Sequence, residues 1–143
     1  MGSGIGHLLG TGLLDAGETR TVAGRLMDRT LFTGYGIRTL STANPGYWPT
    51  RRRAGAVWSQ DTAWIVMGLL RTGFQEEAAQ LAAGLLAAAE GFDYRLPELF
   101  SGQPALEVRP PLPYPSACRP HAGAAAAAVP VALALGGFRA NAL

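Results

Sequence analysis

Two apolar segments of helical periodicity lie next to each other with almost no chain between them. The first runs from Ala63 to Arg71 and is apolar nearly all round. The second runs from Phe74 to Ala89 and has one polar and one apolar side. Only Thr72-Gly73 separates them, and glycine commonly ends a helix. So short a connection forces neighbouring helices to run antiparallel. The sequence therefore predicts a helical hairpin whose first helix needs burial on most of its sides.

Three further segments have helical character. Gly6 to Leu14 predicts a weak helix or the end of one, and a clearer helix runs from Asp15 or Ala16 to Met27. Ala117 to Leu135 predicts a last helix, bent or broken at Pro130. Because no strand pattern of any length is visible, the predicted fold class is all-α, with about five helices.

Two long loops separate these helices. Phe32 to Pro49 is punctuated by glycine and proline and contains a short extended piece at 37–40. Asp93 to Ser116 holds six prolines. Loops of this length inside a compact domain are commonly functional, and the polar and aromatic side chains are concentrated in them. We therefore expect helical hairpins arranged around a site that is built from loops.

Charge and cysteine content exclude several classes of function. The net charge is only +2, and the one concentrated basic run, Arg51 to Arg53, favours a solvated loop over a nucleic-acid or phosphate site. The single cysteine, Cys118, excludes a disulfide framework and a cysteine-cluster zinc site, and is interpreted as a small core residue. His7 and His121 have no carboxylate at metal-ligand spacing. We expect no metal, no cofactor and no nucleic-acid partner.

The uncharged run from Ala122 to Phe138 approaches the minimum length of a membrane span. Alanine gains little from lipid and Pro130 interrupts the run, so a buried helix of small residues is the favoured interpretation. The first five residues lack the basic and apolar regions of a signal peptide. We expect no membrane association and a cytoplasmic location.

Glu98 is the first candidate for chemistry. It follows Pro97 and is flanked by apolar residues on both sides, a setting that suits a carboxyl group to acid–base work. The alternative is a structural ion pair with Arg95 or Arg109.

Four more loop residues and one at a helix start are candidates for binding. Asp61 precedes a helix, so an N-cap is its favoured alternative role. The indole faces of Trp48 and Trp58, and the ring of Tyr47, can stack on sugar rings or simply fill a packing gap. Arg38 lies in the extended piece and, if buried, is expected to need a carboxylate partner.

Eight short stretches of the sequence carry a resemblance to a known family. In order they are GHLL at 6–9, LFTGYGIRTLS at 31–41, NP at 44–45, GAVW at 55–58, DTA at 61–63, GLLRTGF at 68–74, RLPELFSG at 95–102 and PYPSAC at 113–118. In this order and spacing they resemble the C-terminal part of the bacterial glycogen-debranching, amylo-α-1,6-glucosidase-like proteins. Each stretch is a weak signal by itself, and the eight together make a specific one.

The resemblance implies a partial (α/α)6 toroid of the six-hairpin type and hydrolysis of glucosyl α-1,6 branches with inversion. In such a reaction a general acid protonates the leaving oxygen and a general base activates water, with the two carboxyl groups about 6.5–9.5 Å apart. Glu98 matches the residue expected to be the base. Arg38, Trp58 and Asp61 match loop residues that line or support the sugar pocket. Tyr47 and Trp48 are the remaining substrate-binding candidates, and an α-glucan or branched maltooligosaccharide is the expected partner.

Three loops depart from the family pattern. Arg52-Arg53-Ala54-Gly55 stands where the family has a Tyr-His-x-Gly run, and Ser59-Gln60 stands in place of Pro-His before Asp61. Arg119 to Gly123 replaces a Ser-Pro-Gln-Ala-Trp run, and the stretch 46–53 is also rearranged. Positions that would contact sugar are thereby changed.

The resemblance also implies that the general acid and half of the toroid lie upstream of residue 1. We therefore expect residues 1–143 to be the C-terminal portion of an incomplete glycosidase domain, inactive by itself. Its unpaired apolar helix faces are expected to cause self-association or to bind a complementing upstream fragment. Two alternatives stay open: a non-catalytic carbohydrate-binding module, and an unrelated helical interaction protein.

Overall fold

The computed structural model describes residues 1–136 and is mostly helical. Its elements, in chain order, are the 3₁₀ helix η1 (Ser3–Leu8), α1 (Ala16–Leu26), β1 (Val57–Trp58), α2 (Ser59–Arg71), α3 (Gln75–Glu90), β2 (Leu99–Phe100), α4 (Ala122–Ala126) and α5 (Ala128–Leu135). The helical class is confirmed, while a small two-stranded sheet was not expected.

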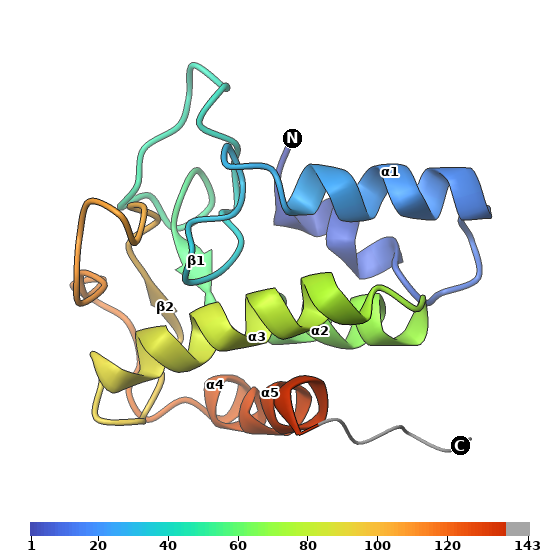
Figure 1. Cartoon of the computed structure of the whole chain (residues 1–143). Helices are drawn as coiled ribbons and strands as arrows, with labels where there is room; N and C mark the ends of the chain where they lie inside the picture. Colours follow the sequence, from blue (N-terminus) through green and yellow to red (C-terminus); the bar gives the residue numbers. More distant parts are fainter. Residues whose placement is uncertain (137–143) are drawn as a thin grey trace.

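The predicted hairpin, α2 with α3, forms the centre of the molecule. Figure 1 shows α1 and η1 on one side of this hairpin and α4 with α5 on the other. Gly73 has a φ of 87°, a left-handed conformation that glycine adopts without strain, and it reverses the chain between the two helices. Helix α2 begins at Ser59, four residues before the expected Ala63, because the chain enters it directly from β1.

The core lies mainly between the hairpin and the first part of the chain. Leu26 of α1 packs with Ile65 and Leu69 of α2 and with Leu81 of α3, and all four side chains are fully buried. A second cluster around Leu85 and Phe100 joins α3 to the small sheet. The predicted apolar faces of the hairpin supply most of this core, but Trp64 on α2 and Leu86 on α3 are exposed.

The two long loops meet at one end of the hairpin, where β1 and β2 join them (Figure 1). The strands are antiparallel, with Val57 opposite Phe100 and Trp58 opposite Leu99. Isolated bridges extend the pairing from Arg38 to Val57 and from Phe100 to Pro113. Each strand has only two residues, which is too short for an alternating apolar–polar pattern to be recognised in the sequence.

The ends of the helices differ in how well the sequence located them. Helix α1 begins as predicted, because Asp15 accepts a hydrogen bond from the N–H of Glu18 while Glu18 accepts one from the N–H of Asp15. The weak helix expected at Gly6 to Leu14 is instead η1, which lies earlier in the chain.

The last helix begins at Ala122, not at Ala117, and it divides at Ala127, not at Pro130. The division places Pro130 in the first turn of α5, where backbone N–H groups have no partner inside the helix and a missing N–H costs nothing.

Two predictions about burial are wrong. None of the residues of α5 is buried, and in the alanine-rich run only Ala124 and Ala127 are, because this layer covers one side of the hairpin and nothing described covers its outer face. Cys118 is exposed because it lies in the loop before α4. Gly137 and Phe138, which end the uncharged run, lie outside the described residues. None of the helices within residues 1–136 is both long and apolar enough to cross a membrane.

Candidate active site

Glu98 lies immediately before β2 and is held from both sides by backbone hydrogen bonds. Its N–H donates to the carbonyl of Cys118 at 3.0 Å, and its carbonyl accepts from the N–H of Ser59 at 3.1 Å. The Ser59 hydroxyl donates to the carbonyl of Pro97 at 2.6 Å. These contacts fix residue 98 between the start of α2 and the loop that leads to α4. The position of its backbone is therefore set by tertiary structure on both sides.

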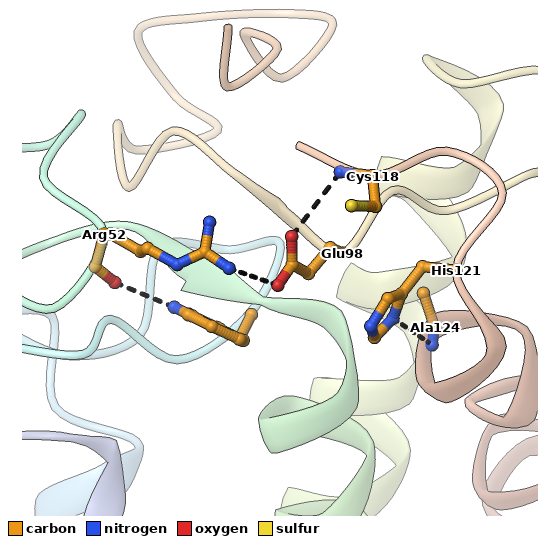
Figure 2. Close-up of polar contacts among 6 residues, drawn as sticks. Arg52, Glu98, Cys118, His121 and Ala124 are labelled. Carbon is orange, nitrogen blue, oxygen red and sulfur yellow. Dashed lines mark hydrogen bonds and ion pairs between the residues drawn. The ribbon is translucent and has the colours of Figure 1, made fainter. Parts of the chain in front are cut away.

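The side chain of Glu98 is only 9% exposed and carries two polar contacts. One carboxylate oxygen forms an ion pair with the guanidinium of Arg52. The other accepts from the N–H of Cys118 at 3.5 Å, a long hydrogen bond. Figure 2 shows the carboxylate between these two groups. The alternative of an ion pair is therefore present, but its partner is Arg52 and not Arg95 or Arg109; the Nε of Arg109 donates to the carbonyl of Ala105.

Arg52 also contacts Trp58. Its guanidinium carbon lies 4.8 Å from the centre of the indole ring, which is within the range of a cation–π interaction. The indole Nε1 in turn donates to the backbone carbonyl of Arg52 at 2.8 Å. Since β1 places Trp58 opposite Leu99, the indole and the Glu98 carboxylate share this arginine. One face of the predicted stacking residue is therefore covered by the chain itself.

Arg38 and Tyr47 form a second group, around the carbonyl of Gly102. The Nε of Arg38 donates to this oxygen at 2.7 Å, and the hydroxyl of Tyr47 donates to it at 3.1 Å. Arg38 is 2% exposed and also donates to the carbonyls of Arg29 and Phe32. The expectation that a buried Arg38 needs a carboxylate is wrong, because backbone carbonyls supply its acceptors. The hydrogen bonds of Arg38 and Tyr47 thus connect the two long loops next to Glu98.

Within residues 1–136, the side chains of the two remaining candidates, Asp61 and Trp48, make no hydrogen bond or ion pair with either group. Asp61 is in the first turn of α2, where a negative charge suits the helix dipole, but the N-cap is Trp58 and the favoured capping role is wrong. The Asp61 carboxylate accepts from the Ser3 hydroxyl at 3.3 Å and lies 3.7 Å from His7 Nε2, so it links α2 to η1. The side chain of Trp48 is 60% exposed.

Sequence reasoning missed the role of Arg52, which was placed in a solvated basic loop. Arg51 and Arg53 are indeed exposed, and only the middle arginine turns toward Glu98. The one sequence signal for Arg52 is its position: it begins the stretch that stands where the related family has a Tyr-His-x-Gly run, just before Trp58. His121 lies near Glu98 in Figure 2, and its Nδ1 accepts from the N–H of Ala124, which caps α4.

The arrangement offers a fixed, enclosed carboxylate beside an aromatic ring and an arginine. A carboxylate of this kind can accept a proton from water, and an indole can stack on a sugar ring. Among residues 1–136 there is no group of three side chains able to hold a metal ion. A fixed carboxylate beside an indole is the kind of pair that can serve acid–base chemistry on a ligand with apolar ring faces.

A family model described as the mannosylglycerate hydrolase MGH1-like glycoside hydrolase domain matches residues 8–100, more than half of the 143-residue chain. The matched region contains every predicted site residue from Arg38 to Glu98. No curated protein and no solved structure matches the chain.

Proposed function

Because this chain belongs to the MGH1-like glycoside hydrolase domain family, we propose that it carries the base-bearing part of an inverting glycoside hydrolase site, with Glu98 as the general base. The observation that supports this most is the fixed, nearly buried carboxylate of Glu98 beside Trp58, inside the region matched by the family model. A carbohydrate is the expected ligand class of such a domain.

In this proposal a water molecule binds between Glu98 and the anomeric carbon of the sugar. Glu98 takes a proton from this water as it attacks, and the configuration at the anomeric carbon inverts. Trp58 supplies a ring face for the sugar, while Arg38 and Tyr47 hold the adjoining backbone rigid through Gly102. Asp61 and the exposed Trp48 are proposed to contact parts of the substrate farther from Glu98.

The resemblance to debranching enzymes implies that the general acid of the pair lies outside this chain. An inverting pair of carboxyl groups stands about 6.5–9.5 Å apart, so the acid does not contact Glu98 directly. We propose that a segment completing an (α/α)6 toroid supplies it. Exposed apolar side chains on α2, α3 and α5, namely Trp64, Leu86 and Val129, support further helices packing on this layer.

The first candidate substrate is a glucosyl α-1,6 branch of an α-glucan. It rests on the eight sequence stretches that resemble debranching enzymes, among them the stretches that contain Arg38, Trp58, Asp61 and Glu98. In this reading the chain is the C-terminal portion of an amylo-α-1,6-glucosidase-like domain.

The second candidate substrate is an α-mannoside of glycerate, the compound in the description of the matching family. One observation favours it: the guanidinium of Arg52 lies directly at Glu98, where it could pair with the carboxylate of glycerate. A neutral glucan offers this cation no charged partner. The two candidates therefore differ in whether Arg52 contacts the substrate.

The test is the substitution Glu98→Gln in the protein with its toroid complete, whether in one polypeptide or with a complementing fragment. Panose and α-mannosylglycerate are the substrates, and sugar release is the measurement. We expect the rate on the true substrate to fall by about 10²- to 10⁴-fold, because the amide cannot accept the proton of water. Proton NMR of the first product formed should show the inverted anomer.

The matched control is Glu107→Gln, which makes the same change on an exposed carboxylate in the same loop. Both variants should melt within a few degrees of the parent protein. Full activity of Glu98→Gln would disprove the assignment of the base. Sugar binding without hydrolysis in the complete parent protein would instead support the non-catalytic binding module.

A further inference from the structure

Arg52 occupies the place that a sugar would need in the proposed site. Its guanidinium touches the carboxylate of Glu98 and lies over the ring of Trp58, the two groups assigned to water activation and stacking. A sugar cannot use this face of the indole while the guanidinium covers it. The same contact also occupies one oxygen of the proposed base.

The backbone that carries Arg52 is held by hydrogen bonds, whereas its side chain is partly exposed to solvent. The N–H of Trp48 donates to the carbonyl of Ala54 at 2.8 Å, and the N–H of Gly55 donates to the Thr39 hydroxyl at 2.9 Å, so the turn is closed at its base. The Arg52 side chain is 41% exposed, compared with 9% for its partner Glu98. It can therefore leave the site by rotating into solvent, without moving the loop.

We propose that Arg52 is an internal ligand of a cation-accepting subsite made by Glu98 and Trp58, and that the sugar ring of a glycoside binds only by displacing the guanidinium from these two side chains. This inference rests on the proposed function of the same site. The subsite should prefer a sugar ring that carries positive charge, since it already accommodates a guanidinium against a carboxylate and a π face. The oxocarbenium-like transition state of glycoside hydrolysis has this character.

A suitable probe is isofagomine, a protonated piperidine that mimics the charged ring. It lacks the hydroxyl that distinguishes glucose from mannose, so it fits either candidate substrate. Its neutral counterpart is 1,5-anhydro-2-deoxyglucitol. Binding is followed by the fluorescence of Trp58 in the full chain carrying Trp48→Phe and Trp64→Phe, which removes the other two tryptophans, both of them exposed.

Arg52→Ala is compared with Arg53→Ala, which removes the same charge from an exposed position in the same loop. A half-exposed ion pair and a cation–π contact together hold Arg52 in place, so its removal should tighten the Kd of isofagomine by about 5- to 30-fold. Arg53→Ala should change it by less than about twofold. The neutral ring should bind more weakly than isofagomine in every variant.

Carbodiimide labelling of Glu98, mapped by mass spectrometry, supplies a readout that needs no ligand. Labelling should rise in Arg52→Ala and not in Arg53→Ala. Unchanged labelling, or weaker isofagomine binding in Arg52→Ala, would overturn the internal-ligand proposal. Increased labelling with no binding of either ring in Arg52→Ala would show that Arg52 covers Glu98 but that Glu98 and Trp58 form no sugar subsite, which overturns this proposal. The proposed function is decided separately, by Glu98→Gln in the completed protein.

Discussion

Arg38 and Arg52 contact two residues of one short segment, Gly102 and Glu98, which are four residues apart. The two arginines differ in burial and in the groups that they bind. Around Gly102, Arg38 is buried and donates to backbone carbonyls from three separate residues. Around Glu98, Arg52 is partly exposed and contacts a carboxylate and an indole ring. The contacts of Arg38 are therefore with backbone atoms, whereas those of Arg52 are with other side chains.

We interpret the region around Gly102 as scaffold and the region around Glu98 as the proposed site. Backbone carbonyls cannot turn away when a guanidinium leaves, so loss of Arg38 would strand buried acceptors. Glu98 and Trp58 can exchange Arg52 for another partner, because a carboxylate and an indole also bind water and sugar. We therefore expect the loops to keep their contacts at Gly102 and to exchange contacts at Glu98.

The largest expected difference in stability is between the two arginines themselves. Arg38→Met should lower the free energy of unfolding by about 3 kcal/mol, because the carbonyls of Gly102, Arg29 and Phe32 lose a charged donor. Arg52→Met should lower it by about 1 kcal/mol or less, as expected for a partly exposed ion pair. Urea unfolding followed by circular dichroism measures both, and equal losses would contradict the comparison.

A pair of glycine substitutions sharpens the contrast between the braced loops and a solvent-facing helix. A Cβ on Gly102 would lie 1.8 Å from the carbonyl oxygen of Gly55, so Gly102→Ala must force the two loops apart and should cost about 2 kcal/mol.

Gly24 lies on an exposed face of α1, where a Cβ would meet no atom within 4 Å. Gly24→Ala should therefore stabilise the protein by about 0.5–1 kcal/mol, because alanine is the better helix former. The same unfolding measurement applies, and a stable Gly102→Ala protein would show that the loops are not tightly packed at this point.

A further comparison concerns the link between the two long loops. Tyr35 donates its hydroxyl to the carbonyl of Val108 at 3.0 Å, and burial raises the pKa of Tyr35 above its ordinary value, although the charge of Arg109 opposes this shift. The raised pKa means that the folded state favours the neutral phenol, so this stability is complete below about pH 10 and is lost as the pH rises further.

Tyr35→Phe should cost about 1 kcal/mol at neutral pH and should unfold with a weaker dependence on pH above about 10. Denaturant unfolding at a series of alkaline pH values measures the difference. Identical pH dependence in the parent and the variant would show that the Tyr35 hydroxyl does not contribute to the link.

The helical part of the fold was predictable because helices are specified by neighbours in the chain. Apolar spacing identified the α2–α3 hairpin, Gly73 its turn, and Asp15 with Glu18 the start of α1. Where a helix boundary depended on a distant contact, prediction failed. Helix α2 begins early because Ser59 bonds to the backbone of Glu98, and the last helix divides at Ala127.

The candidate site was predictable only in its residue types. Glu98 and Trp58 were identified as loop residues suited to sugar chemistry, and their proximity follows from a sheet of two residues per strand. The partner of Glu98 is 46 residues away in the chain, and Arg95 and Arg109 were favoured because they are close in sequence. Whether Glu98 is a base stays a prediction.

The sequence by itself determined the mostly helical class, the central hairpin and the glycoside hydrolase character, since these depend on periodicity, turn residues and ordered motifs. Tertiary structure alone decided which of three adjacent arginines turns inward, that Arg38 is held by backbone carbonyls, and that Cys118 is exposed while its N–H faces Glu98. The physical reason is that contacts between loops depend on how the packed helices place the loop ends in space. Neighbouring residues in the sequence do not determine that placement.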